Sequence, residues 1–191
     1  MSNMIDPLVE RIGARIRAER DRRDWTLAEL ADASGVSRAM IHRIERGESN
    51  PTAVVLGKLS AAFRLSVATL LDPDGTAEAE RVRRAEAAPQ WLDPETGYAR
   101  RQISGPGFPA EVAEVRLPAG AEVPYPAAAF TFHRQIIWVL DGHLTFREGE
   151  SVHELSAGDT VELGAPAPCV FVNSTQTECR YAVVLVRDEA P

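Results

Sequence analysis

Hydrophobic residues recur at helical spacing through the first third of the chain. In the segment TLAELADASGVSRAMIHRIERGESNP, which begins at Thr26, apolar side chains return every three or four residues. Thr26 and Glu29 have the spacing of a capping box, and Gly35 can adopt the left-handed backbone that ends a helix. Two short helices joined by a tight turn are therefore predicted, over 26–34 and 37–46.

Further helices are predicted on both sides of this pair. Pro7 suits a first helical turn, and Asn50 followed by Pro51 has the form of an N-cap and a first helical residue. Ser66 can cap a last short turn. These helices are predicted over 7–23, 52–63 and 67–71.

From residue 97 onward the helical spacing disappears and short alternating runs stand between turn residues. Pairs such as Asp141-Gly142 and Glu148-Gly149 break the runs at the regular intervals of a barrel or sandwich. The pattern predicts an antiparallel β domain. Its strands are expected in the runs YARRQIS, AEVAEVRL, FTFH, QIIWVLDG, HLTFRE, SVHEL, DTVEL, PCVFVN and CRYAVVLVR.

A polar, alanine-rich stretch separates the helical and β patterns. It is opened by Pro73 and Gly75, and we interpret it as a linker that can contain a short helix. The predicted organisation is a helical domain over 1–72, a linker over 73–89 and a β domain over 90–191.

The charge is divided between these two domains. The chain has a net charge of −7, yet its first 72 residues carry eleven Lys and Arg against ten Asp and Glu. Six arginines crowd the first predicted helix, some of them facing solvent. Acidity of the whole chain is therefore no argument against nucleic-acid binding, which needs only a local basic surface.

The second helix of the central pair has one apolar and one basic face. Ser37 can cap it, Ile41 and Ile44 lie on its apolar side, and Arg38 and Arg43 point outward. Such a helix suits the major groove of DNA. The alternative is a helical hairpin with a solvated basic face, which the agreement of cap, turn glycine and basic helix disfavours.

Residues 8–71, including IERGESNP after the basic helix, resemble the Cro/Xre-type DNA-binding domain. The resemblance implies a five-helix, lambda-repressor-like helix-turn-helix fold. It also implies base and phosphate contacts by Thr26, Ser37, Arg38, Ala39, His42, Arg43 and Arg46, with a backbone phosphate contact by Asn50.

The order QIIWVLDGHLTF, HELSAGDTVEL, PCVFVN resembles the core of the cupin family, a double-stranded β-helix jelly roll. The family's metal site uses three histidines and one glutamate. Here the paired histidines fall on Ala129 and Thr131, or on Ala128 and Phe130 in a longer loop. Gln135 replaces the glutamate and Cys169 the last histidine. We therefore expect no metal, no cofactor and no cupin enzyme activity.

A mostly apolar pocket with a few polar anchors is expected on the inner wall of the β domain. His133 is either a hydrogen-bonding group for a ligand or an exposed residue, and core filling is the alternative for the apolar members. Arg100 and Arg101 on the first predicted strand can pair with a ligand carboxylate or neutralise the acidic surface. The predicted effector residues are Arg101, Thr131, His133, Gln135, Ile137, Cys169, Phe171 and Asn173.

The fusion of the two domains resembles a family of bacterial transcriptional regulators in which the cupin domain senses a small metabolite. It implies a homodimer on a double-stranded operator, acting as a repressor or dual regulator. The effectors of such proteins include amino acids, sulfur compounds and polyamines. Two alternatives stay open: a cupin metalloenzyme with an accessory DNA-binding domain, and a DNA-binding protein whose β domain only dimerises.

The cysteine count and the hydropathy pattern bear on location. Cys169 and Cys179 are too far apart for a zinc motif, and free thiols fit a reducing compartment. No apolar run is long enough to span a bilayer, and the chain start lacks the features of a signal peptide. A cytoplasmic protein without membrane contact is expected.

Overall fold

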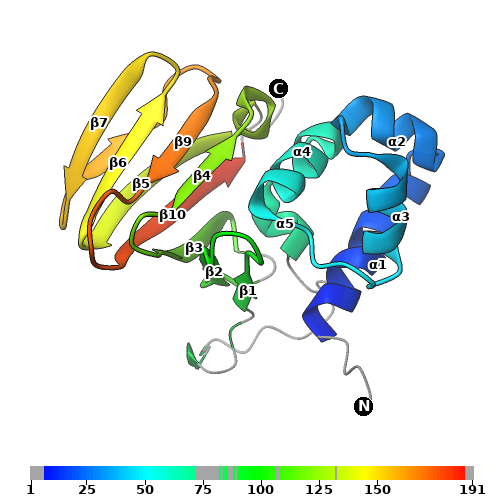
Figure 1. The fold of residues 1–191 in the computed structure, drawn as a ribbon, viewed down its shortest axis with the longest axis horizontal. Coiled ribbons are helices and arrows are strands. Elements are labelled where there is room, and N and C mark those ends of the chain that lie inside the picture. The colour runs from blue at the N-terminus through cyan, green and yellow to red at the C-terminus, as the bar shows by residue number, and fades with distance from the viewer. Residues whose placement is uncertain are drawn as a thin grey trace.

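Helices come first in the chain and strands second, and each group forms its own layer structure (Figure 1). A computed structural model describes residues 7–71, 82, 84–85, 88, 90–105, 108–131 and 133–187, without the side chains of His133 and Arg187. Most of the predicted linker, including its possible short helix, lies outside these residues.

The five predicted helices are all present. Their ends lie one or two residues inside most of the predicted ranges, because the capping residues stand outside the helices that they cap. The helices are α1 (Pro7–Asp21), α2 (Leu27–Ser34), α3 (Arg38–Glu45), α4 (Ala53–Phe63) and α5 (Val67–Leu71).

Local capping sets the turn between α2 and α3 as the sequence predicts. The Glu29 amide donates to Thr26 Oγ1 at 3.2 Å, and the Thr26 amide donates to Glu29 Oε2 at 2.7 Å. Gly35 has φ +66°, and the Ser37 hydroxyl accepts from the Met40 amide at 3.3 Å. The capping box and the turn glycine are thus confirmed.

The predicted N-cap of α4, Asn50, is wrong by two residues. Thr52 is the N-cap, and its hydroxyl accepts from the Val55 amide at 3.3 Å. Pro51 therefore precedes the cap and is not the first helical residue. Asn50 does not cap α4, because its side-chain amide bonds to residues of the β domain, as described below.

Helices α1 and α3 touch backbone to backbone. A Cβ added at Gly13 of α1 would lie 2.2 Å from the carbonyl oxygen of Ile44 in α3. Ile12 and Ile16 of α1 pack beside this contact and are fully buried, as are Ile41 and Ile44 on the inner side of α3. This contact sets the position of α3 relative to α1 and the core.

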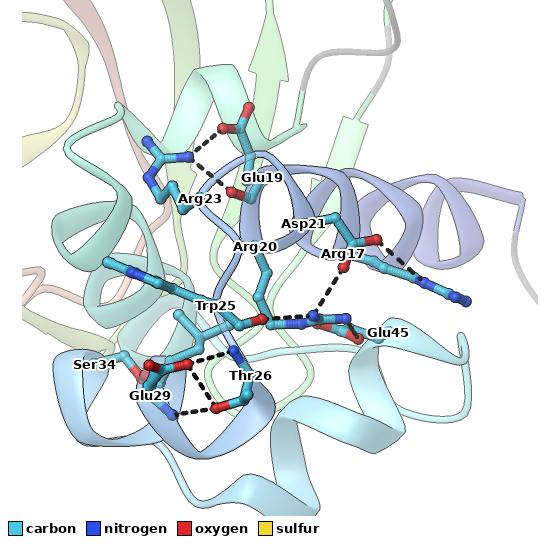
Figure 2. Close-up of polar contacts among 11 residues, drawn as sticks. Arg17, Glu19, Arg20, Asp21, Arg23, Trp25, Thr26, Glu29, Ser34 and Glu45 are labelled. Atoms are coloured by element: carbon cyan, nitrogen blue, oxygen red, sulfur yellow. Dashed lines mark hydrogen bonds and ion pairs between the residues drawn. The ribbon is translucent and has the colours of Figure 1, made fainter.

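Ion pairs hold the end of α1 against the end of α3 (Figure 2). Arg20 donates from Nε to Glu45 Oε1 at 2.7 Å and from Nη2 to Glu45 Oε2 at 3.0 Å. It also donates to the Trp25 carbonyl at 2.8 Å. Several of the α1 arginines are therefore engaged within the domain, since Arg17 pairs with Asp21 and Arg23 with Glu19.

Glu19 is a fully buried carboxylate that pairs with Arg15, Arg22 and Arg23. Burial alone would raise its pKa, but the bonds from Arg23 and Arg22 outweigh burial and lower it below 4.5. A lowered folded pKa contributes stability above the unfolded pKa, and this contribution is lost as the pH falls through the folded value.

We expect Glu19→Gln to flatten the acid limb of stability. Urea midpoints measured between pH 7 and pH 3 should fall less in this variant than in the wild type, because the glutamine cannot take up the proton. The variant should also be less stable at pH 7, since three guanidinium groups lose their anion. An unchanged acid slope would contradict a lowered Glu19 pKa.

The β domain is a sandwich of two antiparallel sheets. One sheet has the order β1-β2-β3-β10-β5-β8 and the other β4-β9-β6-β7. From β3 to β10 the chain winds from sheet to sheet, which is the double-stranded β-helix of a jelly roll. The strands are β1 (Gln90–Leu92), β2 (Ala99–Gln102), β3 (Ala110–Leu117), β4 (Glu122–Tyr125), β5 (His133–Asp141), β6 (His143–Glu148), β7 (Ser151–Ser156), β8 (Thr160–Glu162), β9 (Cys169–Val172) and β10 (Cys179–Arg187).

Two parts of the strand prediction differ from the structure. The run FTFH is not a strand, because a 3₁₀ turn, η2 (Ala127–Phe130), begins after Pro126 and only its last residue joins β5. Strand β4 was not predicted, since Pro124 reads as a break. It tolerates proline because it is an edge strand paired only with β9.

Strand register places alternate residues on the inner face of the larger sheet. Arg100 of β2 lies opposite Val115 of β3, which lies opposite Tyr181 of β10. Neighbouring residues such as Arg101 and Glu114 face outward in the next row. Arg100 is therefore an interior residue and Arg101 an exterior one.

Candidate DNA-reading helix and ligand cavity

The outer side of α3 is a basic surface. Arg38, Ala39, His42 and Arg43 are exposed, whereas Ile41 and the following Ile44 anchor the helix from beneath. Within the described part of the chain, no ion pair engages Arg38, His42 or Arg43. Their charges are thus available to a ligand outside the protein.

The other residues of the predicted DNA contact set already hold internal bonds, and Asn50 is only half-exposed. The Thr26 and Ser37 hydroxyls cap α2 and α3, and Arg46 pairs with Glu48 at 2.6 Å. Asn50 faces the β domain: its Nδ2 donates to the Leu92 carbonyl at 3.1 Å and its Oδ1 accepts from Trp91 Nε1 at 3.0 Å. Its amide is therefore occupied on both atoms.

Further contacts tie the helical domain to the β domain. Asp93, which is 2% exposed, accepts from the Ala53 amide at the start of α4 at 2.7 Å. Glu111 of β3 accepts hydrogen bonds from Ser66 and from Thr69, the latter at 2.8 Å. These bonds hold α4 and α5 against one end of the sandwich, an arrangement visible in Figure 1.

Helix α4 packs closely on the sandwich at Gly57. A Cβ added there would lie 2.7 Å from Cδ1 of Tyr125, which is a buried residue of β4. The Tyr125 ring therefore packs directly on the α4 backbone, and no larger residue at position 57 fits without moving it.

A cavity of about 40 Å³ lies at this junction of the two domains. Two of its lining residues, Ser66 and Val67, come from the helical domain, and the rest come from the inner side of the sandwich and from η2. The lining consists of Ser66, Val67, Tyr98, Arg100, Tyr125, Ala129, Phe130, Gln135, Phe171, Tyr181, Val183 and Leu185.

The predicted effector residues divide into two groups. Gln135 and Phe171 line the cavity, as predicted. Arg101, Thr131, Ile137, Cys169 and Asn173 do not, and the side chain of His133 lies outside the description.

The reasons for these differences are structural. Arg101 pairs with Glu114 on the outer face of the sheet, and Thr131 is exposed. Ile137 is fully buried in the core. The Asn173 side chain holds a turn, donating to the Leu117 carbonyl at 3.0 Å and to the Thr177 carbonyl at 2.7 Å.

Three tyrosines and Arg100 belong to the cavity although the sequence analysis did not assign them to it. Arg100 was considered only together with Arg101, and the two-residue period of β2 decides between them. Tyr125 was hidden because its strand was not predicted. Tyr98 and Tyr181 come from distant segments, so no local signal links them.

Metal-binding groups do not gather in the described part of the chain. No set of three His, Cys, Asp or Glu side chains in the described residues could hold a metal ion. Burial raises the pKa of Cys169 to about 12 and that of Cys179 to about 11, so both thiols keep their protons at neutral pH. Protonated thiols are poor metal ligands.

Among the described residues, no helix is both long enough and apolar enough to cross a membrane.

Comparison with known proteins places both parts of the chain. A helix-turn-helix family model matches residues 16–70. The chain is 34% identical over 73 residues to the HTH-type transcriptional regulator SutR of Escherichia coli, and 42% identical over 62 residues to SinR of Bacillus subtilis. These matches cover 38% and 32% of this chain, and only 41% and 56% of the two relatives.

One solved structure matches almost the whole chain. A crystal structure of an HTH_3 family transcriptional regulator from Vibrio cholerae has a TM-score of 0.75 at 21% identity, covering 95% of this chain and 98% of its own. At that identity the likeness establishes the common fold of both domains. The chain therefore joins a helix-turn-helix domain, matched over residues 16–70, to a β-sandwich domain of jelly-roll topology.

Proposed function

We propose that this protein is a sequence-specific DNA-binding transcriptional regulator without enzymatic activity, whose cupin domain responds to a small molecule. The observation that carries the proposal is the outer face of α3. Its exposed Arg38, His42 and Arg43 have no internal partner in the described part of the chain, and capping residues and the Gly13 contact fix the helix that presents them.

The relatives support a regulatory role, because SutR and SinR are named as transcriptional regulators and share the helix-turn-helix part of the chain. By this proposal α3 enters the major groove and Arg38 and Arg43 contact base edges or phosphates. Repression or dual regulation would follow from where the operator lies relative to a promoter.

Recovery of bound DNA tests the proposal. Purified full-length protein is mixed with sheared DNA of its own host at about 0.15 M salt, and the retained fragments are sequenced. We expect a shared motif with two related half-sites. Uniform recovery of all fragments would indicate only electrostatic, sequence-independent binding and would refute the proposed function.

A homodimer is part of this proposal, and the outer face of the larger sheet is its proposed interface. Trp138 is 48% exposed there, beside the exposed Ile136 and Val186. A groove of about 300 Å³ adjoins them and carries both Arg134 and Glu162. A face with an exposed aromatic residue, a groove and charges of both signs can be self-complementary, as a two-fold interface requires.

We expect Trp138→Glu to convert the dimer to a monomer at micromolar concentration. A charge at the centre of an apolar interface costs more than the remaining contacts return. Light scattering after size-exclusion chromatography gives the mass directly. Val152→Glu is the matched control, because Val152 is 58% exposed on β7 of the other sheet. A dimer that survives Trp138→Glu but not Val152→Glu would place the interface on the smaller sheet.

A second candidate function is a β domain that only dimerises. The cavity favours ligand binding instead, since a buried arginine lines it and two residues of the helical domain, Ser66 and Val67, close it against the sandwich. A β domain that only dimerised could have a solid core, without a buried arginine beside a cavity.

A further inference from the structure

Arg100 is a buried cation without an anion. Only 8% of the residue is exposed, and its Nε is buried with no hydrogen-bond partner. Within the described residues no ion pair joins it to a carboxylate. Buried guanidinium groups are normally paired, because an uncompensated charge in the interior costs several kcal/mol. An unpaired buried guanidinium of this kind indicates a partner that comes from outside the chain.

Hydroxyl groups surround this cation. Tyr98 lies within hydrogen-bond reach of Arg100 and of Tyr125, and Tyr181 faces the same space. Burial raises the pKa of Tyr125 and of Tyr181 well above that of free tyrosine. These phenols therefore keep their protons and can donate hydrogen bonds to an anion.

The rest of the cavity is apolar and small. Phe130, Phe171 and Leu185 form much of its wall, and Gln135 adds an amide. Its volume of about 40 Å³ is far below the roughly 300 Å³ and more of typical metabolite pockets. A large ligand does not fit this form of the cavity, so its ligand is expected to be small.

We propose that this cavity binds a small organic anion, a carboxylate with a short aliphatic chain, through Arg100 and the tyrosine hydroxyls. The inference rests on the proposed regulatory function only for its biological role. A planar carboxylate accepts two parallel hydrogen bonds from a guanidinium group. The apolar wall selects an aliphatic body over an inorganic ion.

The position of the cavity gives this site a regulatory consequence. Ser66 and Val67 line it at the start of α5, and Tyr125 packs on the α4 backbone at Gly57. A carboxylate that draws the Tyr125 hydroxyl toward Arg100 therefore changes the surface on which α4 rests. Ligand binding and the placement of the helical domain are coupled through this tyrosine.

Binding can be measured on the full chain without DNA. The probes are sodium acetate, propionate and butyrate, with sodium sulfate, phosphate and chloride at equal ionic strength as the other arms. Thermal unfolding is followed for the wild type, for Arg100→Met and for the outward-facing control Arg101→Met. Tyr98→Phe removes one hydroxyl and keeps the ring, so it serves if Arg100→Met does not fold.

We expect saturable stabilisation of the wild type and of Arg101→Met by one or more carboxylates. The apparent dissociation constant should rise at least tenfold in Arg100→Met and severalfold in Tyr98→Phe. Equal responses of wild type and both cavity variants would overturn the site. Stabilisation by sulfate or phosphate but by no carboxylate would overturn the ligand class.

These outcomes are separable from the proposed function. A protein that binds carboxylates as described but recovers no specific DNA would keep the site and lose the regulatory role. A protein that reads DNA and ignores every carboxylate would lose the site alone.

Discussion

Glu45→Ala is expected to lower the free energy of unfolding of the helical domain by about 3 kcal/mol. The Glu45 carboxylate accepts hydrogen bonds from Nε and Nη2 of Arg20 at 2.7 and 3.0 Å. The Glu45 side chain is 7% exposed and the Arg20 side chain 14%. Removing one partner of such a bidentate pair leaves the other charge partly buried and uncompensated. Urea unfolding followed by circular dichroism at 222 nm measures the loss.

Two further variants serve as controls for this prediction. Arg17→Ala breaks an exposed pair with Asp21 at 3.7 Å, and it should cost less than about 1 kcal/mol. The double variant Arg20→Met, Glu45→Leu should recover much of the stability, because both charges are removed together. A Glu45→Ala protein as stable as Arg17→Ala would show that this pair does not hold α1 against α3.

Arg43→Ala is expected to weaken operator binding by about 1–3 kcal/mol, roughly 5- to 150-fold, if its guanidinium contacts a base. The side chain is exposed on α3 and has no ion pair within the described residues. Arg38→Ala, five residues earlier on α3, should behave in the same way. Fluorescence anisotropy, measured with the recovered motif and with a scrambled duplex, distinguishes a base contact from a phosphate contact.

The scrambled duplex gives the decisive comparison. A base contact lowers affinity for the motif alone, whereas a phosphate contact lowers affinity for both duplexes alike. Arg147→Ala on β6 removes an exposed arginine of the β domain and should leave both affinities unchanged. Normal operator binding by Arg38→Ala and by Arg43→Ala would refute the role of α3.

The helical domain could be predicted from sequence because its signals are local. Thr26 with Glu29, Gly35 and Ser37 act within four residues of their partners, so spacing alone identifies them. Asn50 shows the limit of this reasoning. Its residue type fits a cap, but Trp91 and Leu92 of the β domain take both atoms of its amide. No local pattern records that competition.

The cavity was predicted only in part because it depends on strand register and on packing between domains. Strand alternation predicts Gln135 on the inner wall, and Gln135 lines the cavity. The family's second motif led to Cys169 and Asn173, whereas the open space lies toward the start of α5, beside Ser66. Arg100 and Tyr125 meet there only after β2, β4 and α4 have packed together.

Protection of the recovered DNA motif against chemical modification tests the central claim most directly. We expect two protected major-groove segments about 34 Å apart, one for each α3 of a dimer. Both should disappear together in Trp138→Glu at concentrations where that variant is monomeric. Protection of the backbone without any major-groove segment, or equal protection of scrambled DNA, would contradict the assignment of α3 as the reading helix.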